Sequence, residues 1–496
     1  MYYIGFDIGS SSIKAALVDT NTGKSIASIS EPEEEMDIVS VRKDWAEQNP
    51  DLWWKNVCKA SKRLLKENTI NPNQIKGIGI SYQMHGLVLL DKNGRLIRDS
   101  IIWCDSRAVE IGNKAFEEIG EEKCMTNLLN SPANFTASKL KWVRDNEPEN
   151  YNRIHKFMLP GDYIAYKFTN IINTTRSGLS EGILWDFKEG KPAEWLLKHY
   201  DVDSDLIPEV VDTFSSQSEL SPKGAEESGL KEGIPILYRA GDQPNNALSL
   251  NVFNPGEVAA TGGTSGVIYA VTDNLSVKEG IKINNFAHVN HKDQKASIGK
   301  LLCINGAGIQ YRWLKNNLNL ETNSYQTMNS LASKVSIGSN NLQLIPFGNG
   351  AERMFDNKTL GTHICNLNLN KHIRSHIFRA ALEGIAFSFV YGMEILKRDG
   401  TEIKVIRAGN DNLFRSEIFS NTVATLINQE IEIYNTTGAV GAARASGLAD
   451  GTFKDFGTMI TKNDHVMTYH PLQNQEDYKE AYKNWKRELN RILKNK

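Results

Sequence analysis

The sequence lacks several features that would place the protein in other functional classes. Its 57 Lys plus Arg nearly balance its 59 Asp plus Glu, and a formal net charge of −2 argues against nucleic acid or an anionic membrane as the main partner. No apolar run approaches the roughly 20 residues that a membrane span needs. The first residues show no basic segment followed by an apolar core, so we expect no secretory signal.

Cysteine is scarce, and the motifs of several large enzyme classes are missing. The five cysteines are scattered and never form CxxC, which favours reduced thiols in a cytoplasmic protein. No GxxxxGK[ST] motif is present and no GxGxxG follows an expected strand, which disfavours P-loop NTPases and dinucleotide-binding dehydrogenases. His372 and His376 lack the glutamate of an HExxH motif, so they predict no zinc site.

The chain does contain the material of a large α/β protein. Its 496 residues are too many for one ordinary core, so two large domains are expected. A helical pattern over 51–68 is followed by a short apolar strand, IKGIGIS, over 75–81. Strands that alternate with long helices in this way predict an α/β architecture.

An internal repeat divides the chain into two similar parts. At an offset of 254 residues SSSIKAALVD meets TSGVIYAVTD, and the positions from Gly9 to Asp19 include four identities and three conservative matches. The offset is close to half the chain, which favours two α/β halves that each open with a strand, a turn and a strand. We place the boundary after the strand PILYRAG, giving domains 1–241 and 242–496, with ligands in the cleft between them.

The two repeated turns, FDIGSSS and ATGGTSG, have the composition of a phosphate-binding pair. Glycine lets backbone N–H groups approach a ligand closely, and hydroxyl groups add donors without bulk. Asp7 in the first turn would then hold phosphate-bound Mg²⁺, usually through water. The alternative is a pair of plain hairpins in which Asp7 caps its own turn.

The segment ILYRAGDQPNNALSL, 236–250, carries an acid at the expected end of a strand. In α/β proteins the chemistry usually lies at the carboxyl ends of strands, where Asp242 falls. Phosphoryl transfer to an alcohol needs one carboxylate to orient the hydroxyl and accept its proton, and the adjacent amides would bind other hydroxyls. The alternative is an Asp-Gln-Pro turn that only begins a helix.

Two further strand ends carry residues suited to a sugar. Met84 and His85 in YQMHG would form one wall of a sugar site, although a lone histidine is more often a structural group. Trp103 in SIIWCDSRA would stack on a sugar face, whereas Asp105 and Arg107 predict a structural ion pair.

Two segments of small residues in the C-terminal half would let a ligand approach the backbone closely. INGAGIQYRWLK (304–315) and VIRAGNDNLFRSEIFSN (405–421) lead into expected helices, whose N-termini would admit a nucleotide. The alternative is helix capping by Asn305 and Asn410. GAVGAARASGLADG (438–451) predicts a helix that packs tightly against its neighbours.

Taken in order, these segments resemble the FGGY family of carbohydrate kinases. The similarity runs from FDIGSSSIKAALVD through DWAEQNPDLWW, GISYQMHGLVLLD, IIWCDSRA, AGDQPNNA and ATGGTSGVIYAV to GNGAERMFDNKTLG, EGIAFSF and GAVGAARASG. The resemblance implies two actin-like, ribonuclease H-like domains with ATP and a sugar in the cleft. It also implies an ATP- and Mg²⁺-dependent transfer of the γ-phosphoryl group to a sugar hydroxyl.

Matching residues to the family's motifs implies a role for each of them. Asp242 would be the general base, and Asp7 would position the Mg²⁺-phosphate. The implied substrate contacts are Met84, His85, Trp103, Asp242 and Gln243. The implied ATP contacts are Ser10, Ser11, Lys14, Gly263, Thr264, Gly306, Gln310, Gly409 and Asn410. The Met-His pair is similar to that of family members that phosphorylate xylulose.

The sequence departs from the family pattern at three places. The glycine triplet near the adenine reads AGND (408–411), the SGERTP segment reads NGAERMFDN (349–357), and GDQ replaces GDN. These changes leave the nucleotide contacts and the sugar open, with ribulose, gluconate or another polyol as alternatives. A non-catalytic sensor on the same fold also stays open, whereas an actin- or Hsp70-like ATPase leaves YQMHG and GDQPNN unexplained. The expected partners are a sugar and ATP, without nucleic acid or membrane, and a homodimer is the assembly considered.

Overall fold

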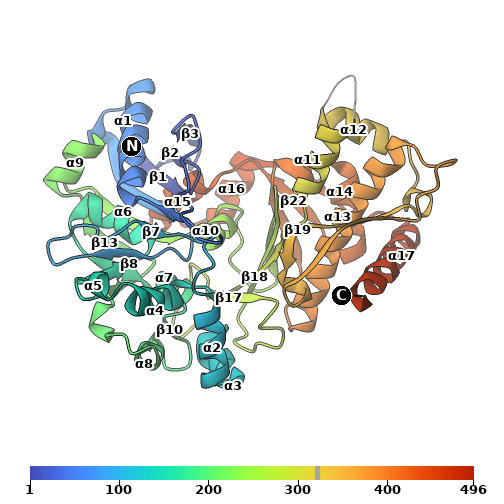
Figure 1. Ribbon diagram of the computed structural model, residues 1–496. Helices are drawn as coiled ribbons and strands as arrows, with labels where there is room; N and C mark the ends of the chain where they lie inside the picture. Colours follow the sequence, from blue (N-terminus) through green and yellow to red (C-terminus); the bar gives the residue numbers. More distant parts are fainter. Residues whose placement is uncertain (319–323, 496) are drawn as a thin grey trace.

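The computed structural model describes residues 1–318 and 324–495. Figure 1 shows two lobes side by side, with the N-terminus in one and the C-terminus in the other. Each lobe is built on one large sheet with helices against it. The five cysteines are unpaired. None of the described helices is long and apolar enough to cross a lipid bilayer.

The sheet of the first lobe has six strands in the order β13-β14-β5-β1-β2-β3. These strands are β1 (Tyr2–Ile8), β2 (Ile13–Asp19), β3 (Ser25–Glu31), β5 (Ile75–Tyr82), β13 (Phe214–Glu219) and β14 (Pro235–Gly241). β1 is antiparallel to β2 and parallel to β5, and β5 is parallel to β14.

The sheet of the second lobe has seven strands in the order β17-β18-β16-β15-β21-β22-β23. They are β15 (Glu257–Gly262), β16 (Gly266–Thr272), β17 (Asn284–Ala287), β18 (Ile298–Ile304), β21 (Val405–Gly409), β22 (Ile431–Tyr434) and β23 (His465–Tyr469). β15 is antiparallel to β16 and parallel to β21, and β21 is parallel to β22.

Five strands of each sheet follow one plan. The orders β3-β2-β1-β5-β14 and β18-β16-β15-β21-β22 have the same sequence of antiparallel and parallel neighbours. The repeated segments fall on β1–β2 and β15–β16, the first hairpin of each plan. The predicted pair of similar α/β halves is therefore confirmed.

Helix α1 (Pro50–Glu67) shows how local sequence builds the cover of the first sheet. Asn49 caps its N-terminus by accepting from the backbone N–H of the second helical residue, and Pro50 stands at the first position. Trp53, Val57 and Leu64 recur at helical spacing and are buried against the sheet together with residues of β1 and β2. Helix α6 (Pro160–Thr169) covers the same face.

The opposite face of the first sheet is covered by helix α15 (Gly438–Ala449). A Cβ added to Gly5 would lie 2.0 Å from the carbonyl oxygen of Ala439, and one added to Gly79 would lie 1.9 Å from that of Ala442. Only glycine on β1 and β5 allows the helix so close to the strands. The tight packing predicted for 438–451 is confirmed.

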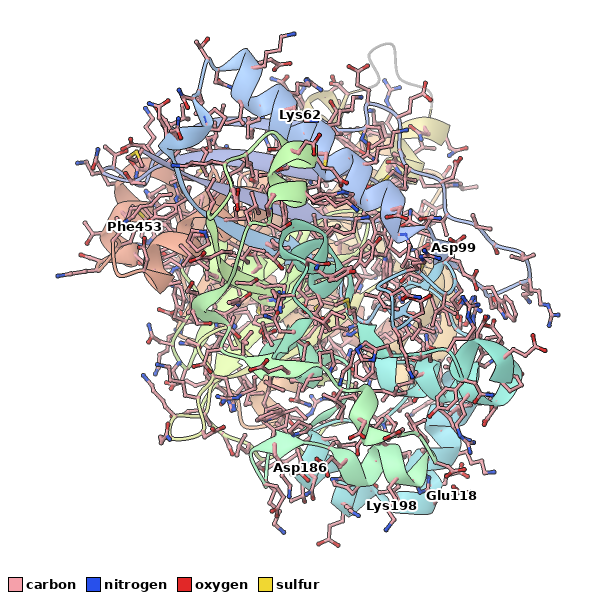
Figure 2. The ribbon with its side chains drawn as sticks, turned by 90° about the vertical axis from the view of Figure 1, so that its left-hand side faces the viewer. Lys62, Asp99, Glu118, Asp186, Lys198 and Phe453 are labelled. Atoms are coloured by element: carbon pink, nitrogen blue, oxygen red, sulfur yellow. The ribbon has the colours of Figure 1, made fainter. Side chains whose placement is uncertain are left out.

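The segment after α15 continues along this face. Phe453 packs edge-on against Tyr3 of β1 with 5.7 Å between ring centroids, and Figure 2 shows it beside the blue strands. Helices α10 (Asp242–Ser249), α15 and α16 (Phe456–Asp464) lie toward the middle of the molecule in Figure 1. Helix α15 comes from the second half of the chain but covers the sheet of the first lobe. The predicted boundary at 241/242 therefore separates the strands of the two sheets and does not separate the helices that cover them. The boundary between the two domains stays a prediction.

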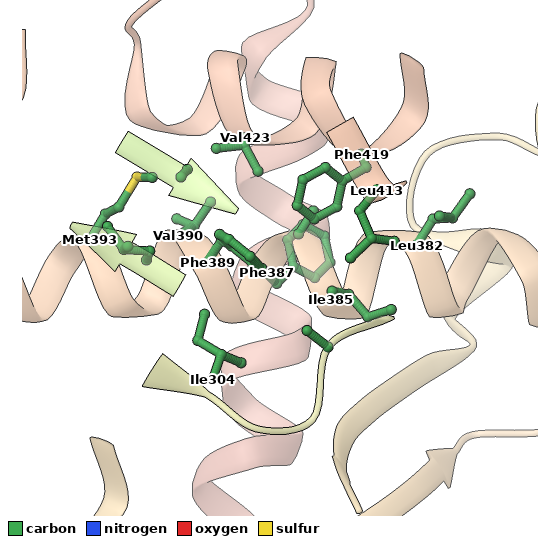
Figure 3. Packing of buried hydrophobic residues seen from close by; sticks show 14 of the residues in the cluster. Ile304, Leu382, Ile385, Phe387, Phe389, Val390, Met393, Leu413, Phe419 and Val423 are labelled. Carbon is green, nitrogen blue, oxygen red and sulfur yellow. The ribbon is translucent and has the colours of Figure 1, made fainter. Parts of the chain in front are cut away.

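The second sheet packs against the long helix α13 (Arg374–Arg398), whose buried side chains share one core with the strands. Helices α11 (Gly308–Asn317), α12 (Tyr325–Ala332), α14 (Glu417–Ile427) and α17 (Gln475–Lys494) pack around α13. Figure 3 shows Phe389 of α13 close to Phe419 of α14, and the two rings meet edge-on at 5.2 Å. This core holds the second half rigidly behind its strand ends.

Shorter elements complete the two lobes. The remaining strands are β4 (Glu47–Gln48), β6 (Val88–Leu90), β7 (Ser100–Ile101), β8 (Lys156–Met158), β9 (Asn173–Thr175), β10 (Trp185–Asp186), β11 (Lys191–Pro192), β12 (Glu209–Val211), β19 (Gln343–Glu352) and β20 (Lys358–Cys365). The remaining α-helices are α2 (Val109–Ile119), α3 (Glu121–Lys123), α4 (Thr136–Asn146), α5 (Pro148–Tyr151), α7 (Arg176–Glu181), α8 (Glu194–His199) and α9 (Pro222–Ser228).

Candidate active site

Three adjacent strands of the first sheet end at the same edge. Tyr82 of β5 pairs with Ile8 of β1 on one side and with Gly241 of β14 on the other. All three strands run parallel, so the residues that follow them leave the sheet together. The first glycine–serine turn, the YQMHG turn and Asp242 are therefore neighbours, as the sequence predicts.

Asp7 points to this edge and is held by the neighbouring strand. Its backbone pairs with Lys14 and Ser81, and the Ser81 hydroxyl donates to Asp7 Oδ1 at 2.8 Å. Burial raises the pKa of Asp7, while the Ser81 hydrogen bond and the Lys14 charge oppose the rise. A Cβ on Gly438 would lie 2.6 Å from Asp7 Oδ2, so the N-terminus of α15 also faces this carboxylate. The Asp7 carboxylate thus accepts its hydrogen bond from Ser81 rather than from a residue of its own turn.

Asp242 is the first residue of α10 and is partly buried. Burial raises the pKa of its carboxyl group to about 7, the negative charge of Asp7 adds to the rise, and hydrogen bonding from Gln243 opposes it. A carboxylate whose pKa lies near the working pH is well matched to taking a proton during a reaction. This geometry fits the general-base role implied by the family resemblance.

The two predicted sugar residues follow β5. Met84 is buried, and a Cβ on Gly241 would lie 2.6 Å from its Cγ, so it packs under the start of α10. His85 has a φ of 62°, which turns the chain sharply at this point. Rings of Phe135 and Phe286 lie 4.7 and 5.3 Å from the imidazole. These contacts leave 16% of the His85 side chain exposed.

The protonation of His85 follows from its surroundings. Burial lowers its pKa to about 3, and the positive charge of Lys139 lowers it further. Its Nδ1 lies 2.9 Å from the carbonyl oxygen of Glu181, to which only a protonated Nδ1 can donate. The imidazole is therefore neutral near pH 7, and its Nε2 is left as an acceptor for a hydroxyl group.

Two buried charged residues of the site lie outside every motif that the sequence suggests. Glu181, the last residue of α7, accepts from the backbone N–H of His85 at 3.1 Å, and burial raises its pKa well above the ordinary value. Lys139 of α4 donates to the carbonyl oxygens of His85 at 2.7 Å and Ile102 at 2.9 Å, and burial lowers its pKa to about 8. Lys139 thus ties the YQMHG turn to the segment that carries Trp103.

Trp103 lies at the rim of the first turn. Its side chain is 52% exposed, and its indole N–H donates to Ser10 Oγ at 3.4 Å. An exposed indole beside the turn leaves a free aromatic face, which is how a sugar ring is commonly held. Two residues further on, Asp105 and Arg107 form a buried ion pair at 2.7 Å, which confirms the structural role predicted for them.

The second glycine–hydroxyl turn borders a pocket of about 330 Å³. Its lining is Gly262, Gly263, Thr264, Gly308, Tyr311, Arg312, Tyr325, Asn329, Leu382, Leu413, Arg415 and Ser416. The rings of Tyr311 and Tyr325 stack at 5.8 Å with 16° between their planes. Flat aromatic walls beside two arginines and a glycine turn suit a purine and its phosphates. Gly263 and Thr264 lie here, in line with the nucleotide role predicted for them.

Gly306 and Gln310, two of the predicted ATP contacts, lie outside the lining of this pocket. A Cβ on Gly306 would lie 2.1 Å from the carbonyl oxygen of Pro346, and its N–H donates to Glu352 Oε1 at 2.8 Å. Gln310 Oε1 accepts from the Thr362 hydroxyl at 2.7 Å. Contacts within the protein therefore explain why a glycine and a glutamine stand at these two positions. Contact of Gly306 and Gln310 with ATP stays a prediction.

The remaining predicted nucleotide residues lie at strand ends or in the first turn. Gly409 ends β21, and the Asn410 N–H donates to the carbonyl oxygen of Tyr434 at 2.8 Å. The carbonyl oxygens of Ser10 and Ser11 accept from Gln48 Nε2 at 2.6 Å and from the Met36 N–H at 2.8 Å, which holds the first turn in place.

Lys14 connects the two halves electrostatically. Burial raises the pKa of Asp411, just after β21, and the Lys14 charge opposes that rise as it does at Asp7. The charge of Lys14 therefore acts on carboxyl groups of both halves. Direct contacts also join the halves, since the Ala287 N–H donates to Ser180 Oγ at 2.8 Å. The two halves are thus in direct contact.

Two family models together cover most of the chain. Residues 2–249 match the N-terminal domain of the FGGY family of carbohydrate kinases, and residues 258–449 match its C-terminal domain. The chain belongs to the FGGY family of carbohydrate kinases. It is accordingly a phosphotransferase with ATP and a sugar as substrates, on the two-domain actin-like fold that the resemblance implied.

Individual relatives are similar over their whole length. A xylulose kinase from Bacillus subtilis (strain 168) is 26% identical, with 99% of both chains covered. A crystal structure of a "xyloylose kinase" from Brucella ovis is 25% identical and superposes over 100% of both chains with a TM-score of 0.89. A Plasmodium falciparum glycerol kinase with ADP reaches the same TM-score at 19% identity, over 99% of this chain and 98% of that one. The backbone alone therefore does not distinguish the acceptor.

Proposed function

We propose that this kinase transfers the γ-phosphoryl group of ATP to D-xylulose, forming D-xylulose 5-phosphate. The observation that carries the proposal is Asp242, whose pKa is raised to about 7 at the strand edge it shares with Asp7 and the Met84-His85 turn. The xylulose kinase name of a full-length relative supports the choice of sugar.

In the proposed reaction Asp242 takes the proton of the C5 hydroxyl as that oxygen attacks the γ-phosphorus. A new O–P bond forms, the bond from the γ-phosphorus to the β–γ bridging oxygen breaks, and ADP leaves with the bonding electrons. The neutral His85 accepts a hydrogen bond from another hydroxyl at Nε2, and Trp103 covers a face of the sugar. General-base help of this kind typically contributes about 10²–10⁴-fold to the rate.

The residues present fit Mg²⁺ carried by ATP rather than a metal caged by the protein. No group of three His, Cys, Asp or Glu suited to a metal occurs among residues 1–318 and 324–495. Mg²⁺ at a phosphate usually takes one or two carboxylates, often through water; Ser81 donates to Oδ1 of Asp7, and Oδ2 accepts no hydrogen bond from the residues that the structure describes. When bound, the ion neutralises charge on the phosphates. We assign Asp7 to this position.

The nucleotide would lie in the second half, with its phosphates between the two turns. Gly263, Thr264 and Arg415 border the pocket, while Ser10, Ser11 and Lys14 approach from the first half. In this arrangement residues 1–241, together with Asp242 and Gln243 at the boundary, bind the sugar, and the rest of residues 242–496 binds ATP, with the first turn contributing at the phosphates. We propose the cytoplasm as the compartment, since ATP is the donor.

The test is an ADP-release assay of the purified chain across D-xylulose, L-xylulose, ribulose, gluconate and glycerol. We expect the highest kcat/KM with D-xylulose and loss of that activity in Asp242→Asn. A clear preference for another acceptor overturns the substrate assignment. Release of ADP at the same rate without any sugar overturns the kinase mechanism itself.

A further inference from the structure

Gln83 is a buried amide without a partner. Its side chain is 3% exposed, and both Nε2 and Oε1 lack a hydrogen bond within residues 1–318 and 324–495. Most buried polar groups in proteins are paired, and an unpaired one lowers the stability of the fold. A glutamine with both ends unpaired, next to the residues predicted to bind a sugar, has the donor and the acceptor that a polar ligand would use.

The position of Gln83 is set by the strand that precedes it. It is the first residue after β5, and its N–H continues the ladder by donating to the carbonyl oxygen of Ile8 at 2.8 Å. Side chains alternate along such a ladder, so Gln83 shares the face of Ser81, whose hydroxyl binds Asp7. β5 lies between β1 and β14, which places Gln83 between the strand that carries Asp7 and the strand that Asp242 follows.

The phosphoryl group of ATP and the acceptor sugar are the two ligands expected at this edge, and the hydrogen-bonding groups of the amide distinguish between them. The amide nitrogen donates and the amide oxygen accepts. A phosphoryl group has only acceptors near pH 7, so it would leave Gln83 Oε1 unpaired. A sugar hydroxyl both donates and accepts, and can satisfy either end of the amide.

We propose that Gln83 binds the acceptor sugar directly, with Oε1 accepting from one hydroxyl and Nε2 donating to a sugar oxygen. The amide thereby holds the sugar so that the reacting hydroxyl faces Asp242, next to the wall formed by Met84 and His85. The inference rests on the proposed function, in that a sugar is the phosphoryl acceptor at this edge.

The central test is Gln83→Met, which removes both polar atoms at nearly constant length. Because the unpaired amide destabilises the sugar-free protein, we expect Tm without sugar to stay equal or rise. We expect KM for the sugar to rise about tenfold or more, with KM for ATP changed less than about twofold, because a site built to bind hydroxyls loses its partners. The rise in Tm that the sugar causes in the wild type should shrink accordingly.

Gln217→Met is the matched control. Gln217 is also buried, in β13, but its Nε2 donates to the carbonyl oxygens of Asp212 at 3.0 Å and Thr213 at 3.2 Å. This variant should lose Tm and keep both KM values. Gln83→Glu is a second variant of the same shape, which loses the Nε2 donor and should also raise KM for the sugar.

The outcomes separate the inference from the proposed function. A higher KM for ATP with an unchanged KM for the sugar would assign Gln83 to the nucleotide and overturn the inference. Unchanged kinetics in Gln83→Met would overturn it as well. If the wild type prefers another acceptor, the substrate assignment fails alone, and the KM of Gln83→Met for that acceptor still decides the role of Gln83.

Discussion

The two halves of this kinase have the same strand plan and different residues at their strand ends. At the repeat offset of 254, Asp7 of β1 corresponds to Thr261 of β15. The fifth strand of the plan is followed by Asp242 in the first half and by Asn435 in the second. The shared plan supplies two facing turns, whereas single residues at the strand ends decide what each turn does.

The electrostatics of the halves differ in the same sense. Burial raises the pKa of Asp7, Asp242 and Glu181, so the first half concentrates buried carboxyl groups at one edge. The second half places a 330 Å³ pocket with stacked tyrosines beside its turn. We therefore propose that proton transfer and sugar binding belong to the first half, and nucleotide binding to the second.

Among the predicted effects, the largest loss of activity should come from Asp242→Asn. Removing the proton acceptor should lower kcat at least about 10²-fold with little change in KM for ATP. The pKa of Asp242 is higher in the folded chain than in the unfolded one, so the protein loses stability as the pH rises from about 4 to about 7, and the full cost is present above about pH 7. Tm at pH 8 should accordingly rise in the variant. Near-normal kcat would remove Asp242 from the mechanism.

A paired substitution at corresponding positions compares the halves directly. Asp7→Asn should lower kcat about tenfold to a hundredfold, because the γ-phosphoryl group loses its positioned Mg²⁺. Thr261→Val, at the same place in the second plan, should change kcat less than about threefold. Steady-state kinetics at saturating ATP measure both. Equal losses in the two variants would mean that the halves share the chemistry.

The smallest expected effect concerns the nucleotide pocket alone. Tyr325→Ala removes one of the two stacked rings and should raise KM for ATP about two- to tenfold while KM for the sugar stays constant. Trp313→Ala is the control, since Trp313 lies on α11, is 56% exposed and does not line the pocket. A change confined to KM for the sugar would place the nucleotide elsewhere.

Much of the fold follows from the sequence because its signals are local or repeated. The glycine–hydroxyl turns between apolar strands recur at one offset, which predicted both the two halves and their facing turns. Asp242 was predictable because an acid directly after an apolar strand and a glycine falls at a strand end. The small residues of α15 likewise predicted close packing, which Gly5 and Gly79 make possible.

Other parts of the site arise only from tertiary packing. Glu181 ends a six-residue helix with no motif, and it meets His85 because α7 packs beneath β14. Lys139 offered one weak signal, since it shares the apolar face of α4 with Leu140 and Val143. The sequence around Gly306 and Gln310 did not reveal their hydrogen-bond partners. These partners, Glu352 and Thr362, come from segments about fifty residues further along the chain.

The pH dependence of kcat/KM for the sugar tests the division of labour most directly. His85, with a pKa of about 3, does not titrate between pH 5 and 9, whereas Asp242 and Glu352 both have a pKa of about 7. The charge of Asp7 raises the pKa of Asp242. Substituting Asp7 should therefore shift the titration of Asp242 and distinguish it from that of Glu352.

We predict that kcat/KM of the wild type rises with pH through about 7 and then levels off, as Asp242 ionises. In Asp7→Asn the midpoint of that rise should move to lower pH, because Asp242 loses a neighbouring negative charge. A profile that is flat between pH 5 and 9, or a midpoint that stays in place in Asp7→Asn, would contradict Asp242 as the proton acceptor.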